Sequence, residues 1–349
     1  MITAKFEMSF ALIKKPIIII LSFIFAITFS GCDLKKEYLF CGKTMGTTYN
    51  IKVVSSVFKN PANLKGKIDK KLFEVNKSMS TYIKDSEISV FNADLSIEKK
   101  HYISPDFFYV MAVADNLYHL TNGAWDGTVK PLVDLWGFGI HEQKNKIPDK
   151  NKISEILDTI GFDKIEISDK GYLKKKIHSI TLDLASIAKG YAVDRVSDLI
   201  RSNGISDFLV EIGGEVYASG LSGKGKPWIV GINTPLKDAP PDSVYARVAL
   251  QDKAMATSGD YRNFFEIDGV RYSHIIDPKT GNPVKNNVVS ASVISSSCTF
   301  ADGLATALMV LGQKKGIDLA KSLKDAQCLI IVQDKDGALK DYYSGKFGN

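Results

Sequence analysis

The chain has 349 residues, of which 45% are hydrophobic and 24% are charged, so its composition is that of an ordinary globular protein. Such a length suffices for one large domain or two small ones. The formal net charge at pH 7 is +6, and no basic stripe with interleaved aromatic side chains occurs along the sequence. The composition therefore gives no reason to expect nucleic-acid binding, and we expect none.

The N-terminal segment has the pattern of a secretory signal. Lys14 and Lys15 precede an apolar run over residues 17–27, and a positive segment followed by such a run is typical of a signal peptide. The run is shorter than the roughly 20 apolar residues that a membrane-spanning helix needs. We therefore predict a signal peptide over residues 1–31, and the alternative is an uncleaved signal anchor.

The end of this segment resembles a bacterial lipobox. Small residues stand directly before Cys32, although Phe29 occupies a position where Leu is usual. We predict that Cys32 is lipidated, that residues 32–43 form a tether and that residues 44–345 form one folded domain. Asp33 resembles the signal that keeps lipoproteins of Gram-negative bacteria on the inner membrane. The expected location is the inner membrane, facing the periplasm, or else the cell surface.

Three segments have the spacing of amphipathic helices. Apolar residues recur every three or four positions in residues 67–79, 105–121 and 184–202. Ser104 is placed to cap the second of these helices, because its hydroxyl can accept from a free backbone N–H. Gly204 follows the third, where glycine commonly ends a helix.

The second half of the chain is richer in strands. Residues 208–212 and 215–217 have the character of strands on either side of Gly213 and Gly214. Two glycines within a strand pattern indicate a bulge or a close approach of the backbone to something bulky. Strands predominate after Ile205 and helices before it, with no regular alternation of the two. The sequence therefore predicts an α+β fold.

A hairpin places a histidine beside a rigid turn. Asp268 and Gly269 separate two short strands, and this dipeptide is typical of a two-residue hairpin turn. The second strand leads to His274, the side chain type most easily poised to move a proton near neutral pH. In a regular strand Ser273 and Asp277 would lie on the opposite face, which argues against a Ser-His-Asp triad. His274 is predicted to act alone as a base or to bind substrate, unless it is a structural histidine.

A carboxylate and a hydroxyl further along form a candidate metal site. Asp302 and Thr306 lie four residues apart, so a helix over residues 303–311 would put them on one face. Both supply the hard oxygen ligands that Mg²⁺ takes, with substrate phosphates and water completing its shell. The alternative is that Asp302 caps the helix while Thr306 packs.

Two charged residues near the start of the helix over 184–202 also indicate a ligand. Lys189 lies in its first turns, where a cation opposes the helix dipole. An anionic ligand near the helix start would explain this position, and the alternative is a solvated lysine. Asp183 lies just before the helix and either caps it or hydrogen-bonds a ligand. A base beside a hard-cation site points to phosphoryl chemistry.

Together these segments resemble the ApbE family of flavin transferases. The resemblance runs in order from about residue 44 to about residue 312. Its motifs are T-M-G-T at 44–47, M-S-T-Y at 79–82, D-S-E-I-S at 85–89, F-N at 91–92, L-W-G-F-G at 135–139, D-L-A-S-I-A-K-G-Y-A-V-D at 183–194, E-I-G-G-E at 211–215, S-G-D-Y-R-N at 258–263, S-H-I-I-D-P-K-T-G at 273–281 and A-D-G-L-A-T-A at 301–307.

The resemblance implies a fold and an activity. The implied fold is α+β of the T-fold-like kind, with antiparallel sheets and packed helices, and residues 44–345 would be its catalytic domain. The implied activity is that of an FAD:protein FMN transferase, which binds FAD and Mg²⁺ and moves FMN onto a threonine hydroxyl of an acceptor protein. The product is a phosphodiester, and AMP is released. Acceptors in the family are typically subunits of membrane electron-transport complexes, of the Rnf type or the sodium-pumping NADH:quinone oxidoreductase type.

The resemblance also assigns residues. The positions that match the family's FAD contacts are Met45, Tyr82, Ala124, Trp125, Asp126, Asp183, Lys189 and His274. The positions that match its Mg²⁺ site are Asp302 and Thr306, and Ser186 is expected to add an oxygen. His274 is the candidate base that takes the proton of the acceptor hydroxyl, and Asp260 is a second candidate. Mg²⁺ and Lys189 would neutralise the charge on the diphosphate as it breaks.

Two other functions stay open at this point. The same site could pass the phosphoryl group to water, which would make the protein a periplasmic FAD pyrophosphatase that releases FMN and AMP. The chain could also be a non-catalytic FAD-binding lipoprotein, although the presence of Asp302, Thr306 and His274 argues against this. Tyr82 is an aromatic side chain that could cover the flavin and exclude water, which favours transfer over hydrolysis.

Overall fold

The computed structural model describes residues 35–57, 61–97, 99–139, 146–261 and 263–348. The predicted signal peptide over 1–31 and the predicted lipidation site at Cys32 lie outside these residues. Of the helices in the described ranges, none has the length and apolar character needed to cross a membrane.

Helices and strands alternate irregularly along the described chain. The helices are α2 (Leu64–Met79), α3 (Glu87–Ala93), α4 (Pro105–Leu120), α5 (Lys130–Leu135), α6 (Lys150–Leu157), the short 3₁₀ helix η1 (Phe162–Lys164), α7 (Ala185–Ser202) and α8 (Cys298–Ser322). The strands are β1 (Lys35–Thr44), β2 (Thr47–Ser56), β3 (His101–Tyr102), β4 (Ile165–Ser168), β5 (Tyr172–Lys175), β6 (Asp207–Ile212), β7 (Glu215–Ser219), β8 (Trp228–Asn233), β9 (Val244–Leu250), β10 (Lys253–Gly259), β11 (Phe264–Ile267), β12 (Val270–Ser273), β13 (Val288–Ser295), β14 (Ala326–Gln333) and β15 (Leu339–Tyr343).

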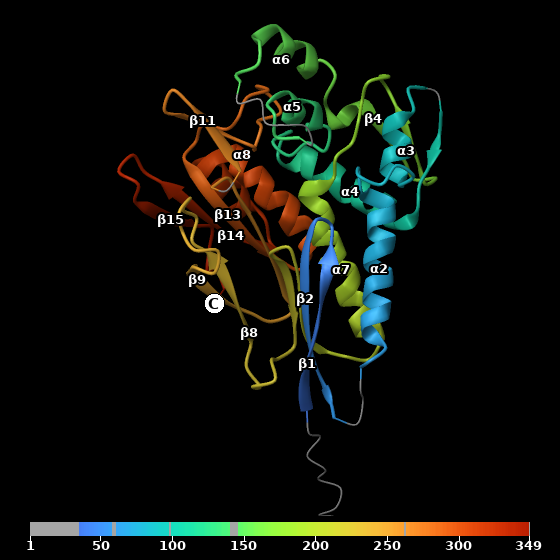
Figure 1. Cartoon of the computed structure of the whole chain (residues 1–349), viewed down its shortest axis with the longest axis vertical. Coiled ribbons are helices and arrows are strands. Elements are labelled where there is room, and N and C mark those ends of the chain that lie inside the picture. Colours follow the sequence, from blue (N-terminus) through green and yellow to red (C-terminus); the bar gives the residue numbers. More distant parts are fainter. Residues whose placement is uncertain (1–34, 58–60, 98, 140–145, 262, 349) are drawn as a thin grey trace, which may run out of the picture.

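One large sheet organises the fold. Its eight strands are antiparallel and follow the order β1-β2-β6-β7-β10-β13-β14-β15. Helix α8 packs on β10, β13 and β14, α7 packs against α8, and α2 lies along α7 (Figure 1). The smaller sheets are β8-β9, β11-β12 and β3-β5-β4. Antiparallel sheets with packed helices agree with the α+β fold predicted from the sequence.

The large sheet is buried on both faces near its centre. Along β13, Ala291 and Val293 belong to the main core, which also contains α7 and α8. Ile294, the next residue along the strand, belongs to a second core with β8 and β9. Because side chains alternate along a strand, the two cores lie on opposite faces of the sheet. All the functional elements described below lie on the helix side.

The predicted tether over 32–43 is wrong from residue 35 onward. Residues Lys35–Thr44 form β1, which pairs along its whole length with β2. Phe40 and Tyr38 pack against the main core, whereas Leu39 between them is 59% exposed. This alternation, together with the backbone pairing, stabilises an edge strand. The folded domain therefore begins about ten residues earlier than the sequence suggested.

Most of the helices and strands agree with their sequence signals. Helix α4 begins at Pro105, and the hydroxyl of Ser104 accepts from the N–H of Phe107, as the capping pattern predicts. The β11–β12 hairpin turns through Asp268 and Gly269, whose φ angles are 50° and 74°. Both residues have the left-handed conformation that this turn type requires.

Gly213 and Gly214 form a turn rather than a bulge. Ile212 pairs with Glu215 across the β6–β7 hairpin, so the two glycines are its two-residue loop, with φ angles of 61° and 103°. The sequence reasoning placed them inside a strand pattern because both flanking segments are strand-like. Because the turn pairs Ile212 with Glu215, it fixes the position of Glu215 at the start of β7.

Helix α8 begins five residues earlier than predicted, at Cys298. The hydroxyl of Ser297 accepts from the N–H of Phe300, and the carboxylate of Asp194 on α7 accepts from the N–H groups of Cys298 and Thr299 at 2.9 Å each. These contacts satisfy N–H groups that a helix start leaves free. Asp302 therefore lies in the second turn, and the alternative that it caps the helix is wrong.

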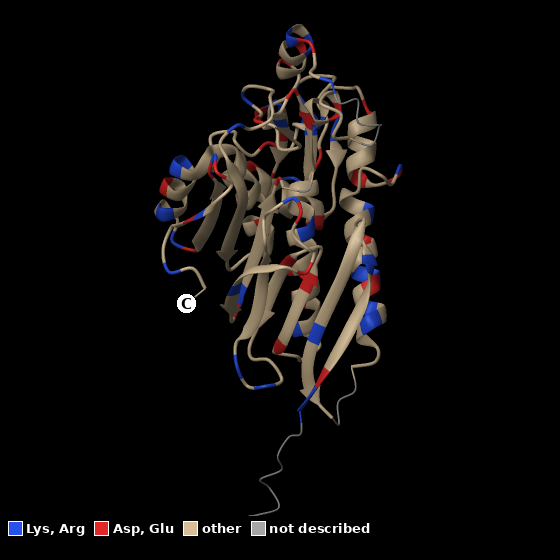
Figure 2. Cartoon of the chain, turned by 60° about the vertical axis from the view of Figure 1, so that its left-hand side comes forward, with Lys and Arg blue, Asp and Glu red and all other residues tan. Residues whose placement is uncertain are grey.

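Charged side chains are mixed over the surface. Lys and Arg are intermingled with Asp and Glu along the described elements, and both signs occur together on α2 (Figure 2). Several of them pair within one helix, as Lys65 does with Asp69 and Lys71 with Glu74. Such exposed pairs contribute little to stability.

Candidate active site

A cavity of about 400 Å³ lies where the start of α7, the second turn of α8, the end of β10 and the segment after β12 meet. Most of the predicted site residues line it, although they come from distant parts of the chain. They are Ala124, Trp125, Asp126, Asp183, Ser186, Lys189, His274, Asp302 and Thr306. The predicted residues Met45, Tyr82 and Asp260 are not among its lining residues.

A close contact between α7 and α8 sets the geometry. The N–H of Gly190 donates to Oδ2 of Asp302 at 2.9 Å. A Cβ atom at Gly190 would lie 2.3 Å from the carbonyl oxygen of Cys298 and 2.8 Å from Cβ of Asp302. Only glycine lets the helices approach this closely, and the approach brings Lys189 and Asp302 to the same wall of the cavity.

Lys189 lies between two buried carboxylates. Its Nζ is 2.5 Å from Oε1 of Glu215 and 3.9 Å from Oδ1 of Asp302. Burial alone would lower the pKa of Lys189, but the attraction of Asp302 and Glu215 outweighs it and raises the pKa. Lys189 is therefore a fixed cation in the cavity wall, and the alternative of a solvated lysine is wrong.

Four oxygen-bearing side chains line the cavity together with this lysine. Oγ1 of Thr306 lies 3.0 Å from Oγ of Ser258, and Oγ of Ser186 accepts from Nε1 of Trp125 at 3.0 Å. Oδ1 of Asp302 receives no hydrogen bond from the described residues. One carboxylate with hydroxyl oxygens suits Mg²⁺, which commonly takes only one or two protein carboxylates. No group of three or more His, Cys, Asp or Glu side chains in the described ranges forms a metal cluster.

Asp126 closes one side of the cavity. Its side chain is buried, and Oδ1 accepts from the N–H and the hydroxyl of Thr128 at 2.8 and 2.6 Å. Burial raises the pKa of Asp126 to about 6, against the lowering effect of the Thr128 hydrogen bonds. The neighbouring Trp125 is buried and contributes an apolar wall.

His274 directly follows β12 and faces the cavity with one nitrogen available. Its N–H donates to the carbonyl of Asn263 at 3.1 Å, and its Nδ1 lies 3.0 Å from the same oxygen. Because a carbonyl only accepts, Nδ1 carries the proton and Nε2 keeps a lone pair. Burial lowers the pKa of His274, so the ring is neutral at pH 7. This is the protonation state of a general base.

The β11–β12 hairpin, which leads to His274, packs against an aromatic cluster. The indole N–H of Trp136 donates to the carbonyl of Gly281 at 2.8 Å, and its ring stacks on Tyr272 with 5.6 Å between centroids. Phe138 stacks on Phe265 in the same cluster. The L-W-G-F-G and S-H-I-I-D-P-K-T-G motifs are thus two halves of one packed unit.

Comparison with known proteins settles the family of this fold and site. The model of the ApbE family matches residues 45–330. The chain belongs to the ApbE family. A relative from Vibrio cholerae, named FAD:protein FMN transferase, is 44% identical over 320 residues, covering 91% of this chain and 94% of the relative. A relative of the same name from Escherichia coli K12 is 34% identical over 334 residues, covering 92% and 94%.

Solved ApbE structures share the fold. The flavin transferase ApbE from Vibrio cholerae superposes with a TM-score of 0.82 at 42% identity, covering 90% of this chain and 99% of that one. The apo form of the flavinyl transferase ApbE from Pseudomonas stutzeri gives a TM-score of 0.81 at 35% identity, covering 90% and 98%. The family and the α+β, T-fold-like ApbE fold predicted from the sequence are therefore confirmed.

Three residues predicted from the ApbE motifs lie elsewhere. Asp260 accepts from Nη2 of Arg271 through its carbonyl at 2.7 Å and through Oδ1 at 3.1 Å, so it is already paired. Burial raises the pKa of Asp260 to about 6, although Arg271 acts to lower it. Met45 is in the β1–β2 turn with a φ of 50°, and Tyr82 is 77% exposed. Contact of Met45 and Tyr82 with FAD stays a prediction.

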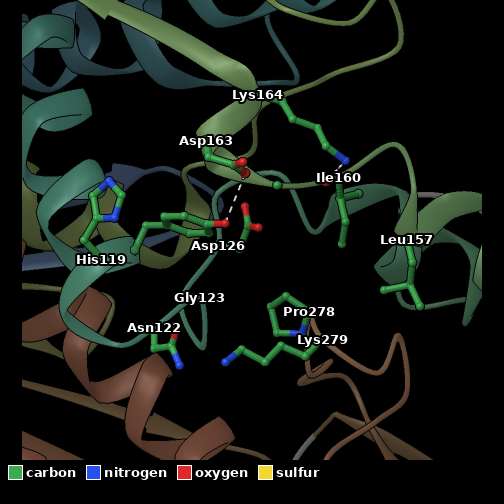
Figure 3. A pocket seen from close by; sticks show the side chains of 12 residues that line it. His119, Asn122, Gly123, Asp126, Leu157, Ile160, Asp163, Lys164, Pro278 and Lys279 are labelled. Carbon is green, nitrogen blue, oxygen red and sulfur yellow. Dashed lines mark hydrogen bonds between the residues drawn. The ribbon is translucent and has the colours of Figure 1, made fainter.

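A second cavity of about 310 Å³ adjoins the first, and Asp126 and Pro278 line both. Asp163 accepts a hydrogen bond from the hydroxyl of Tyr118 at 3.1 Å beside Asp126, and the Lys279 side chain extends toward Asn122 (Figure 3). Of the site residues assigned from the motifs, only Asp126 lines this polar hollow.

Sequence reasoning missed Glu215 and Ser258, which both contact predicted site residues. The signal was present, because Glu215 ends the E-I-G-G-E motif and Ser258 begins S-G-D-Y-R-N. The local pattern of the first motif points only to its glycines, and the residues around Ser258 carry no signal for a contact with Thr306. A buried role for Glu215 depends on Lys189, 26 positions away in the sequence, which no local pattern reveals.

Proposed function

We propose that the protein is an FAD:protein FMN transferase, which moves FMN from FAD to a threonine hydroxyl of an acceptor protein and releases AMP. One observation carries the proposal: the Lys189–Asp302 pair and the neutral His274, distant in sequence, line a single cavity. The relatives of this name from Vibrio cholerae and Escherichia coli K12 align over more than nine-tenths of the chain, at 44% and 34% identity.

The reaction balances with the groups at hand. The acceptor hydroxyl oxygen forms a bond to the phosphorus of the FMN half, and the bond from that phosphorus to the bridging oxygen breaks. AMP leaves with the bridging oxygen. The hydroxyl proton passes to Nε2 of His274, because Nδ1 is held by Asn263. Lys189 stabilises the negative charge that develops on the phosphates.

The described residues fit a magnesium ion, which we include in the proposal. Oδ1 of Asp302 would hold it together with Oγ1 of Thr306, and Ser186 would add an oxygen. When bound, the ion would neutralise diphosphate charge and help the bridging oxygen leave. Its support is the chemistry of the donors: one unpaired carboxylate oxygen and hydroxyl groups, all on the wall that also carries Lys189.

The location and the acceptors are also proposals. We infer a lipid on Cys32, attachment to the inner membrane and exposure to the periplasm, on the support of the signal-like residues that precede this cysteine. The proposed acceptors are subunits of membrane electron-transport complexes of the Rnf or sodium-pumping type. Radiolabelled palmitate should label the wild-type chain in cells and should not label Cys32→Ala.

Hydrolysis is a second candidate for a specific reason. Tyr82, the aromatic side chain expected to cover the flavin, is 77% exposed and does not line the cavity. Access of water to the reacting phosphorus would make the protein an FAD pyrophosphatase. A tyrosine that closes over bound FAD would favour transfer.

One assay separates these functions. The chain from residue 33 onward is incubated with FAD, Mg²⁺ and an acceptor domain, and parallel samples contain EDTA or lack the acceptor. A fluorescent acceptor band on a denaturing gel supports transfer. Free FMN with no labelled acceptor supports hydrolysis, and neither product would mean that the chain only binds FAD.

A further inference from the structure

Glu215 lies behind the cavity wall and is not among its lining residues. It is the first residue of β7, and its side chain is 2% exposed. Oε1 holds Nζ of Lys189 at 2.5 Å, whereas Oε2 is buried with no hydrogen-bond partner in the described part of the chain. A buried carboxylate is costly unless it is well paired. Its presence here therefore calls for a function.

The ammonium group of Lys189 lies near two buried carboxylates, Glu215 and Asp302, and it hydrogen-bonds only Glu215. The separation of 3.9 Å between Lys189 and Asp302 is too long for a hydrogen bond. The other oxygen of Asp302 is fixed by the N–H of Gly190 at 2.9 Å. Asp302 is thus left with one carboxylate oxygen that is fixed in direction and lacks a donor.

We propose that Glu215 is a positioning residue that holds Lys189 away from Asp302 and so keeps Asp302 available to a divalent cation. This inference rests on the proposed function, and in particular on the metal site at Asp302. Without the Glu215 carboxyl group, the nearest acidic side chain to Lys189 is Asp302. The ammonium group would then close on Oδ1 and occupy the place of the ion.

The same contact fixes Lys189 when the cation is present. A divalent ion on Asp302 repels the ammonium group, and the Lys189 side chain is 30% exposed, so it has a route to solvent. The pairing with Glu215 keeps Nζ in the wall, where it can face a phosphate. Glu215 thereby allows two cationic groups to lie side by side in one site.

The first test is structural and needs no metal or substrate. In a metal-free crystal structure of Glu215→Gln, we expect Nζ of Lys189 to move to within about 3 Å of Oδ1 of Asp302, a hydrogen-bond distance. A variant in which Lys189 stays in its present position, or turns out to solvent, would overturn the proposal.

The second test measures cation affinity. Glu215→Gln should raise the Mg²⁺ concentration for half-maximal turnover by about tenfold or more, as expected when a charged pair forms in the ion's place. Binding of Mn²⁺ alone, followed by electron paramagnetic resonance, should weaken by a similar factor. Adding Lys189→Met to Glu215→Gln should restore Mn²⁺ affinity, because no ammonium group then competes. A double variant as weak as the single one would mean that Glu215 acts on the cation directly.

Matched controls exclude simpler explanations. Glu74→Gln removes the same charge from an exposed pair with Lys71 and should leave Mn²⁺ binding unchanged. Glu211→Gln removes a charge from the same β6–β7 hairpin without freeing Lys189, and the new amide oxygen can still accept from the N–H of Gly214. Its effect should stay within about threefold, as expected for a screened charge. An equal loss in Glu211→Gln would show that net charge alone is responsible and would refute the role of Glu215.

The metal site at Asp302 and the positioning role of Glu215 can be refuted separately. Mg²⁺-dependent turnover retained by Asp302→Ala would contradict the metal site itself. Loss of that turnover in Asp302→Ala, combined with a normal Mg²⁺ requirement in Glu215→Gln, would leave the metal site standing and remove only the role of Glu215.

Discussion

The carboxylate of Asp194 links the two helices that build the site, so its replacement tests the whole arrangement. Oδ1 accepts from the N–H of Cys298, and Oδ2 accepts from the N–H and hydroxyl of Thr299 and from the hydroxyl of Ser297. In Asp194→Asn, an amide NH₂ replaces Oδ2 with nearly the same shape. The two hydroxyl groups can rotate to accept from it, but the N–H of Thr299 loses its acceptor.

The expected cost follows from these contacts. One buried N–H without a partner costs about 1–3 kcal/mol. Loss of a negative charge at the start of α8 adds about 0.3–2 kcal/mol. We therefore expect Asp194→Asn to lower the free energy of unfolding by about 1–5 kcal/mol. For a domain of roughly 300 residues, whose unfolding entropy is about 0.6 kcal/mol/K, this corresponds to a fall in Tm of about 2–8 °C.

Thermal unfolding followed by circular dichroism measures this effect. The control is Asp198→Asn, one turn further along α7, where the carboxylate is exposed and pairs with Arg195 and Arg201 at 2.8 and 2.9 Å. We expect the control to change stability by less than about 0.5 kcal/mol. Equal melting temperatures for Asp194→Asn and the wild type would refute the view that α7 caps α8.

Four further predictions concern the cavity and its walls. His274→Ala should slow FMN transfer by about 100-fold or more while weakening FAD binding far less, since a general base contributes about 10²–10⁴-fold; equal losses of rate and affinity would make His274 a binding residue. Burial lowers the pKa of His274. We therefore expect kcat/KM to stay constant from pH 8 down to the ordinary pKa of a histidine and to fall only below that pH. A fall in kcat/KM already at pH 7.5 would contradict this. Asp302→Ala should abolish Mg²⁺-dependent turnover with an unchanged circular dichroism spectrum. Gly190→Ala should destabilise the fold by about 1–3 kcal/mol through overpacking, measured by urea denaturation, and an unchanged midpoint would show that the helices can separate freely.

Local signals in the sequence predicted much of the fold. Ser104 and Pro105 marked the start of α4, and Asp268 with Gly269 marked the β11–β12 turn, because in both cases the stabilising contact joins residues close in sequence. The start of α8 was missed because part of its capping comes from Asp194, more than 100 residues away. No pattern around Cys298 reveals that partner.

In the candidate site, too, features with a local sequence signal were predicted, and features that depend on distant residues were missed. The residue types of Asp302, Thr306 and His274 suggested their chemistry, and the family motifs placed them together. The hydrogen bond that fixes the tautomer of His274 comes from Asn263, and the partner of Lys189 is Glu215 on another hairpin. Both depend on how β7, β12 and α7 pack, so they become visible only in three dimensions.

The early start of β1 would limit how a membrane-anchored form of the enzyme meets its acceptor. If Cys32 carries a lipid, three residue steps separate it from Lys35, and even a fully extended chain spans about 10 Å over that length. The bilayer would then lie against the end of the sheet where β1 begins, opposite α6 (Figure 1). A connection this short would keep the domain close to the membrane surface. Acceptor threonines would have to be presented at the level of the cavity, on segments that stand away from the membrane surface.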